Sequence, residues 1–356
     1  MIRGLTGLFL TIIFSFAASG QDLPETVEQN ESDLQYPSFR LFEDREMLEI
    51  TLRFDLSTYF RTKPKKEYLP ASITFHLNST DTITRDIKLR TRGVFRNSFC
   101  VFAPIELNFR KVDFGYSDLN SISKLKMVTQ CRSGSLNADY ILKEFIAYKL
   151  FNVLTDTSFR VRFLAINYID TRKDRKPISH YGIFIEPIDM LTERTNSSEV
   201  KSTNLTQKNI EPWIMDRMAI FNYMIGNYDW SIPGQHNVKI IKPLDVNPSG
   251  PGIAIPYDFD WTGLVDSSYA IPVEDTGLED VTERLFTGVC RTREVYQKRL
   301  EIFSAKKDDF YRVISECPNL DQRLRRELTY YLDGFFNRLE GRNMVVEDFL
   351  NTCKNF

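Results

Sequence analysis

The chain has 356 residues, of which 42% are apolar and 26% are charged. This composition is ordinary for a globular protein and excludes a fibrous or a disordered chain. The formal net charge is only −2, so electrostatics give no reason to expect a nucleic-acid partner.

Residues 1–20 have the layout of a secretory signal peptide. They carry one Arg, then an apolar run, then the small residues Ala18, Ser19 and Gly20, which predicts cleavage near Gln21. No later segment approaches the roughly 20 apolar residues that a membrane span needs. We therefore expect a secreted or periplasmic chain without a membrane span, unless an uncleaved signal peptide tethers it.

The five cysteines form no C-x-x-C pair, and no His/Cys spacing resembles a tetrahedral zinc site. In an oxidising compartment one or two disulfides are expected, with at least one thiol left over, but the spacing does not reveal the pairing. The cysteines are Cys100, Cys131, Cys290, Cys317 and Cys353.

After a polar, acidic leader at residues 21–45, the next part of the chain is strand-like. Short segments with alternating apolar and polar residues fill the chain to about residue 130. They read LEITLRFDL, ASITFHL, TITRDIKLRTRG, APIELNFRKV and SKLKMVTQ. Residues 136–154 then have apolar side chains at helical spacing, and two more strand candidates end near residue 190.

The second half begins with a polar stretch and becomes helical. EPWIMDRMAIFNYMIG predicts a buried helix with Pro212 in its first turn and Gly226 just past its end. Two short apolar runs follow, VKII and GIAIPY, and the Pro- and Gly-rich segment between them predicts a small hairpin. Residues 277–356 are expected to be mostly helical.

Three oxygen-bearing side chains flank this hairpin. Asp229 follows the helix, Asn237 precedes the first strand and Asp258 follows the second. A short antiparallel hairpin brings its outer ends together, so Asn237 and Asp258 should lie close to each other. Their oxygens suit a hard cation such as Mg²⁺ or Mn²⁺, while Asp229 remains available to receive a proton.

The motifs GNYDW and HN, then IPYDFDW, with RTRG upstream, resemble the CotH-like kinases, a family of atypical protein-kinase-like proteins. The resemblance spans roughly residues 70–270. It implies an α+β, two-lobed protein-kinase-like fold. Residues 46–190 would form an N-terminal nucleotide-binding lobe with an antiparallel sheet and one helix, and residues 191–356 a mainly helical catalytic lobe.

The resemblance also implies roles for the residues of the hairpin. Asp229 would be the catalytic base, and Asn237 and Asp258 would hold the Mg²⁺ or Mn²⁺ that accompanies ATP. Asp260 would be either a second acidic ligand or a helix cap. His236 is set aside as a packing or hydrogen-bonding residue.

The upstream half would bind the nucleotide. A kinase-like site needs a strand Lys ion-paired to a helix Glu, and Lys126 with Glu144 is the best match, although a solvated strand lysine is a substantial alternative. Arg92 is also expected at the nucleotide, and the rival phosphate contacts are Arg90 and Lys111.

Two segments would complete the nucleotide site. Residues 93–103 stand where a glycine-rich loop would lie but contain one Gly. FIEPI at residues 184–188 is either an adenine-binding hinge or an ordinary strand end.

We therefore expect a secreted, metal-dependent phosphotransferase that moves a phosphoryl group from ATP to a hydroxyl of an exported protein or another acceptor. A non-catalytic pseudokinase, acting as a binding or structural module at the cell surface or in a coat-like assembly, is the main alternative. A metal-dependent hydrolase using Asp229, Asp258 and Asp260 ranks last, because two-metal hydrolases usually gather more ligands.

Overall fold

The structure is a computed structural model. It describes residues 39–43, 46–202, 204–245, 247, 250–274, 276–341 and 344–355. All of these belong to one compact unit. The predicted signal peptide at residues 1–20 lies outside the described residues, as does the leader at residues 21–45 except for residues 39–43.

Seven strands in the first half form a barrel. They are β1 (Leu48–Phe54), β2 (Leu69–His76), β3 (Thr82–Thr91), β4 (Ile105–Asn108), β5 (Lys124–Thr129), β6 (Val161–Asp170) and β7 (Ile178–Ile185). Alternate residues point inward, as the burial pattern of β1 illustrates, and the interior is filled with aliphatic and aromatic side chains. The predicted alternation is thus confirmed, and its period of two explains why each strand has one buried face.

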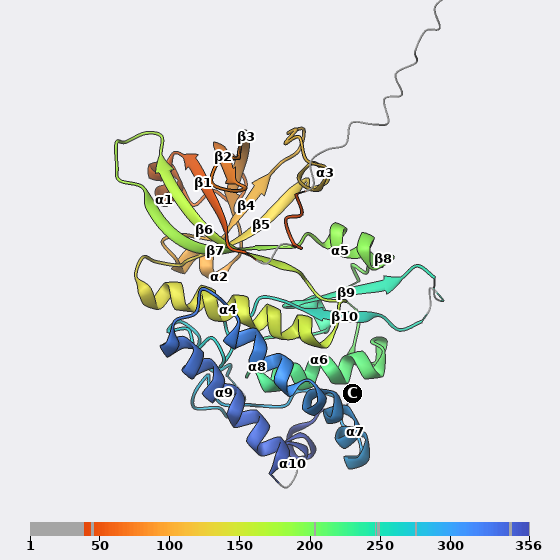
Figure 1. The fold of residues 1–356 in the computed structure, drawn as a ribbon. Helices are drawn as coiled ribbons and strands as arrows, with labels where there is room; N and C mark the ends of the chain where they lie inside the picture. Colours follow the sequence, from red (N-terminus) through yellow and green to blue (C-terminus); the bar gives the residue numbers. More distant parts are fainter. Residues whose placement is uncertain are drawn as a thin grey trace, which may run out of the picture. The chain divides into compact units, whose positions relative to one another are not determined.

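The barrel closes because β1 pairs in parallel with β6 while it pairs antiparallel with β2 (Figure 1). The expected two-lobed protein-kinase-like fold, with an antiparallel sheet in its N-terminal lobe, is therefore wrong. The sheet is closed and mixed. Alternation along one strand cannot predict this closure, because it reports which face is buried and not which distant strand supplies the neighbour.

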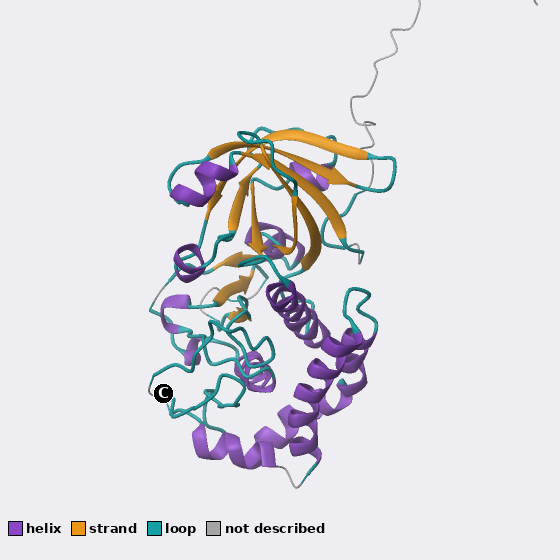
Figure 2. Ribbon diagram, turned by 90° about the vertical axis from the view of Figure 1, so that its left-hand side faces the viewer, coloured by secondary structure: helices purple, strands orange, loops and turns teal. Residues whose placement is uncertain are grey.

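Short helices interrupt the strands, so the expectation of one helix in this half is also wrong. They are α1 (Leu56–Thr62), α2 (Phe95–Phe99) and α3 (Ser117–Asn120). The one long helix, α4 (Ser135–Leu154), matches the prediction for residues 136–154. It is buried on most sides, because it packs on the outer face of β6 and β7 and on the helices that follow (Figures 1 and 2).

The second half has a small sheet and more helices. The sheet has the order β10 (Ile253–Pro256), β9 (Val238–Pro243), β8 (Ser197–Glu199). The helices are α5 (Ile188–Arg194), α6 (Pro212–Met224), α7 (Arg293–Ala305), α8 (Lys307–Ser315), α9 (Gln322–Glu340) and α10 (Met344–Thr352), with 3₁₀ turns at Gln207–Asn209 and Pro233–Gln235. The predicted α6 and β9–β10 hairpin are thereby confirmed.

Two disulfides form, Cys100–Cys131 and Cys290–Cys353, and Cys317 is a buried free thiol. This agrees with the expectation of one or two bridges and a leftover cysteine.

Among the described residues, no helix has the length and apolar character needed to cross a membrane.

Candidate functional site

The β9–β10 hairpin brings two predicted site residues to the same end of the small sheet. Val238 lies opposite Pro256 in the register, and the Tyr257 N–H donates to the Asn237 carbonyl at 3.0 Å. Asn237 precedes β9 and Asp258 follows Tyr257, so the hairpin carries both side chains to one edge, as expected. Both residues have a left-handed backbone, with φ of 50° and 67°. Asn and Asp tolerate this conformation better than other non-glycine residues.

Asp229 is fixed by both residues that follow the 3₁₀ turn. The Asn237 side-chain Nδ2 donates to the Asp229 carbonyl and to Asp229 Oδ2, each at 2.9 Å, and His236 Nε2 lies 2.8 Å from Asp229 Oδ1. The Asp229 side chain is still 27% exposed. It is therefore oriented by its neighbours and accessible to a reactant. Because Nδ2 of Asn237 faces Asp229, its Oδ1 is the atom available to a cation.

Backbone pairing ties the Asp229 loop to the segment after Asp260. The N–H groups of Gly263 and Leu264 donate to the carbonyls of Gly226 and Ile225, each at 3.0 Å. Gly226 has φ of +64°, and a Cβ there would lie 2.2 Å from the Tyr331 hydroxyl oxygen. Only glycine fits this position, as its predicted place just past the helix end suggests.

Helix α4 fixes Asp258 from the other side. The Asp258 N–H donates to the Tyr148 hydroxyl oxygen at 2.9 Å. The ring of Tyr148 packs against Phe259 with centroids 4.7 Å apart. The segment after β10 is therefore held on α4 through backbone and ring contacts, which leaves the Asp258 carboxylate out of this packing.

A buried cluster of acids with one cation lies beside Asp258. Arg96 Nη1 is 3.5 Å from Glu144 Oε2 and 3.6 Å from Asp260 Oδ2, and the Tyr269 hydroxyl donates to the same Asp260 oxygen at 2.9 Å. Burial, followed by the neighbouring Asp258 carboxylate, raises the pKa of Asp260 to about 6. Burial and then Asp260 raise the pKa of Glu144 well above its ordinary value. We call Arg96, Glu144 and Asp260 the acid cluster.

The predicted Lys126–Glu144 ion pair is replaced by an Arg96–Glu144 pair. The segment at residues 93–103, expected to cover phosphates, instead forms α2, and it carries Arg96 into the interior, where the side chain is 9% exposed. Asp260 does not cap a helix either, because turns follow it. Its role as a cation ligand stays a prediction.

Lys126 and Arg92 lie in the same electrostatic neighbourhood. Burial, then Arg92 and Lys239, lower the pKa of Lys126 to about 8, while Asp258 opposes this shift. The Lys126 ammonium also lies 5.6 Å from the centre of the Tyr257 ring. Arg92 and Lys239 therefore lie close enough to Lys126 to disfavour its protonated form, and Asp258 lies close enough to favour it.

The donor set fits a hard cation in its chemistry, with Asn237 Oδ1 and the Asp258 carboxylate at one edge of the hairpin. Asp260 is less suited, because Tyr269 and Arg96 already engage its Oδ2. Among the described residues there is no group of three or more His, Cys, Asp and Glu side chains placed to hold a metal. Asn237 is not counted in such a group, because its ligand would be an amide oxygen.

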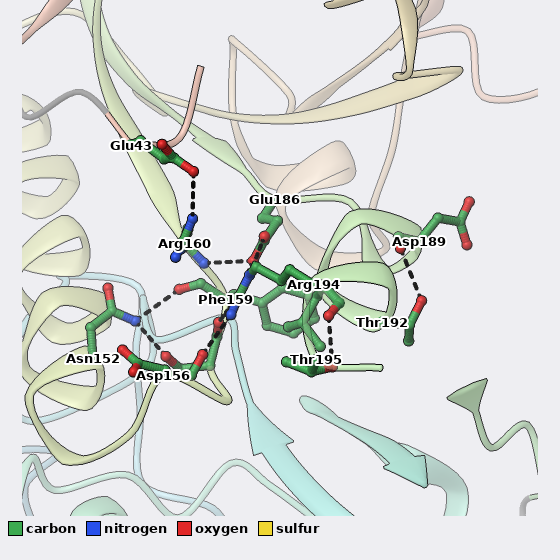
Figure 3. A network of polar contacts seen from close by, with 12 residues as sticks. Glu43, Asn152, Asp156, Phe159, Arg160, Glu186, Asp189, Thr192, Arg194 and Thr195 are labelled. Atoms are coloured by element: carbon green, nitrogen blue, oxygen red, sulfur yellow. Dashed lines mark hydrogen bonds and ion pairs between the residues drawn. The ribbon is translucent and has the colours of Figure 1, made fainter. Parts of the chain in front are cut away.

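The FIEPI segment is a buried junction. Glu186 accepts from Arg194 Nε and Nη2 at 2.7 and 2.8 Å and from the Arg160 N–H at 3.0 Å, and its own N–H donates to the Arg160 carbonyl (Figure 3). Arg194 also donates to the carbonyls of Asp156 and Ser158. The N–H of Glu186 is thus already used, which favours the strand-end alternative over the hinge.

Three contacts of this site were missed from the sequence. They are the contacts of Arg96, of Tyr148, and of His236, which was set aside as a packing or hydrogen-bonding residue. The HN pair next to the GNYDW loop was a usable signal for His236. The contacts of Arg96 and Tyr148 had no local signal, because each reaches a residue distant in the chain.

No protein-family model matches this chain, and no curated protein matches it, so the resemblance to the CotH-like kinases rests on the motif residues alone.

Proposed function

We propose that this protein is a metal-dependent phosphotransferase that moves a phosphoryl group from ATP to a hydroxyl of an exported protein or another acceptor. The observation that supports it best is the set of bonds around Asp229. This carboxylate is oriented by Asn237, is partly exposed, and lies within electrostatic range of Asp260. The proposal rests on the site alone, since the expected kinase-like sheet is not present.

The residues divide into three roles. Asp229 accepts the proton of the acceptor hydroxyl, because its oxygens are held in place but accessible. Asn237 and Asp258 would hold Mg²⁺ or Mn²⁺. When bound, this cation would neutralise part of the phosphate charge. Lys126 and Arg92 bind phosphate oxygens.

The crowding of cations supports the phosphate role. Burial, and then the nearby Arg92 and Lys239, lower the pKa of Lys126. A bound polyanion would relieve the repulsion, so the site favours an anionic ligand over an unoccupied state. The adjacent carboxylates favour a cation for the same reason, which is the charge pattern that a metal–nucleotide pair complements.

The test is transfer of labelled phosphate from ATP to a serine-rich model polypeptide and to the protein itself, with Mg²⁺ or Mn²⁺. We expect Asp229→Ala to lower the rate by about 10³-fold, as loss of a catalytic base does, while nucleotide binding persists. Asp245→Ala, on the exposed hairpin turn, is the matched control. The absence of both transfer and a nucleotide-induced thermal shift would overturn the proposal.

A non-catalytic binding module is the second candidate. The observation that favours it is that Glu144 pairs with Arg96 and not with Lys126, so the ion pair expected of a nucleotide site does not form. Such a module would bind its partner equally well with Asp229→Ala, and it would show no transfer under any metal. The same variant therefore separates the two candidates.

A further inference from the structure

An apolar patch covers the outer side of α2. Six of the eleven large apolar side chains that are exposed in the described part of the chain belong to it, and Val94 and Ile271 are the most open of the six, at 84% and 66%. Exposed apolar side chains that lie together mark interaction sites, whereas single ones need no explanation. The members of this surface, which we call the α2 patch, are Val94, Phe95, Phe99, Val101, Ile271 and Val273.

A row of contacts makes the patch continuous. Phe99 stacks on Phe95 with ring centroids 5.3 Å apart, and Phe95 meets Trp261 in a T-shaped contact at 4.7 Å. The Trp261 indole N–H donates to the Ile271 carbonyl at 3.0 Å. At the other end of the row, the Arg132 guanidinium lies 4.9 Å from the centre of the Phe99 ring. The row therefore runs from a cation, across three aromatic side chains, to the segment that holds Ile271.

The patch stands on a small core of its own. The buried ring of Tyr269 packs against it, with its centroid 5.9 Å from that of Phe95 and 5.6 Å from that of Phe99. Tyr269 shares this core with the Cys100–Cys131 disulfide. A surface that is already fixed loses little conformational entropy when a partner covers it, so this support favours binding.

The Phe99 end of the patch is basic. Lys63 Nζ donates to the carbonyls of Ser98 and Cys100 at 3.3 and 2.7 Å. Because these acceptors carry no net charge, the positive charge of the lysine is not cancelled by an anion. The other exposed basic residues at this end are Lys65, Lys66 and Arg132.

The Ile271 end of the patch is acidic. Residues 274–283 contain five acidic residues and no basic one. Glu274, which begins this stretch, is exposed and follows the patch directly. A Cβ at Gly263 would lie 2.8 Å from the Val281 carbonyl oxygen. The acidic stretch therefore runs beside the segment that follows β10.

We infer that a second copy of this chain covers the α2 patch, in a dimer whose two-fold axis passes near Phe95. A two-fold axis turns one surface onto itself, so the apolar centres meet and the basic end of each copy lies on the acidic end of the other. Within the described residues, Arg132 and Glu274 form no ion pair inside their own chain, so both charges are available across the interface. An anionic lipid surface would instead attract one end of the patch and repel the other. This inference is independent of the proposed phosphoryl transfer.

Sedimentation velocity of the purified protein over a range of concentrations tests the dimer. We expect a reversible species with twice the mass of the chain. Val94→Ser combined with Ile271→Ser should weaken the dimer by about tenfold or more, because each copy loses two apolar side chains from the interface. Leu244→Ser combined with Met344→Ser removes two exposed apolar side chains elsewhere, and this matched control should change nothing. A monomer at every concentration, or a dimer that the first pair of substitutions leaves unchanged, would overturn the inference.

A charge exchange tests the symmetry of the dimer. Arg132→Glu and Glu274→Arg should each weaken it by about tenfold, because like charges then face each other at both ends of the interface. The two substitutions together should restore the dimer to within about threefold of the unmodified protein. Arg326→Glu, at an exposed position of α9, controls for the change in net charge and should have no effect. A combined variant as weak as either single variant would contradict the two-fold arrangement.

Flotation with vesicles of phosphatidylglycerol and phosphatidylcholine in equal parts examines the lipid alternative. We expect the protein to remain unbound. A monomer that binds these vesicles, and that loses this binding when Val94 and Ile271 are both replaced by Ser, would overturn the second copy and assign the α2 patch to a lipid surface.

Discussion

Two buried clusters of arginine and carboxylate differ in how completely their charges are compensated. Arg194 and Glu186 form a one-to-one pair with short contacts of 2.7 and 2.8 Å, and carbonyls accept the remaining donors of Arg194. In the acid cluster, Arg96 faces two carboxylates at 3.5 and 3.6 Å, with Asp258 nearby.

The difference indicates what each cluster is for. A buried pair that satisfies its own charges and hydrogen bonds joins elements of the structure, here β7, α5 and the loop before β6. The acid cluster has an excess of negative charge, and Glu144 Oε1 has no hydrogen-bond partner in the described structure. An excess of this kind favours an added proton or cation, which is expected of a functional site.

The largest expected effect tests the compensated pair. Arg194→Met should lower the free energy of unfolding by about 3–5 kcal/mol, because it leaves the Glu186 carboxylate buried without its cation. Urea denaturation measures this change. Arg172→Met removes an exposed partner of Asp55, with the Arg172 side chain 72% exposed, and should change stability by about 1 kcal/mol or less. Equal losses in the two variants would contradict the comparison.

The second effect concerns the disulfide next to the acid cluster. Cys100 follows α2 directly and is bonded to Cys131, closing a loop with a sequence separation of 31. Replacing both cysteines by Ala should lower the free energy of unfolding by about 4 kcal/mol, through the added entropy of the unfolded chain.

The same double variant should also release Arg96 and so alter the acid cluster. Removal of Cys290 and Cys353 is the control, because it should destabilise the chain by a similar amount without touching the cluster. If both double variants change the proposed transfer from ATP equally, the link between α2 and the site is absent.

The smallest effect is the pH dependence of the acid cluster. Asp260 has a folded pKa of about 6, above the roughly 3.9 of an unfolded Asp. The folded state thus holds its proton more tightly, and this stabilisation is present below pH 4 and is lost as the pH rises through 6. The loss should be on the order of 3 kcal/mol, since each pKa unit corresponds to about 1.4 kcal/mol.

Asp260→Asn should remove this contribution, so that its unfolding free energy falls less between pH 4 and 6 than that of the unmodified protein. Denaturation at several pH values measures the difference. Asp308→Asn, at an exposed helix position, is the control and should preserve the original profile. An identical profile for Asp260→Asn would show that Asp260 does not bind the proton.

Local features of the molecule were predictable from the sequence. The period of two along the strands, the helical period of α4 and α6, and the Pro- and Gly-rich turn between β9 and β10 all arise within a few neighbouring residues. The hairpin in turn predicted that Asn237 and Asp258 share one edge, because a short antiparallel connection allows no other arrangement.

Tertiary structure alone decided which distant residues meet. Glu49 and Asn167 hydrogen-bond at 2.9 Å across 118 residues where β1 and β6 close the barrel, and Glu144 pairs with Arg96 and not with Lys126. The disulfide pairing belongs to the same class. Local periodicity determines which face of an element is buried, whereas the neighbour on that face depends on how the whole chain packs, and several distant side chains of equal chemistry compete for each place.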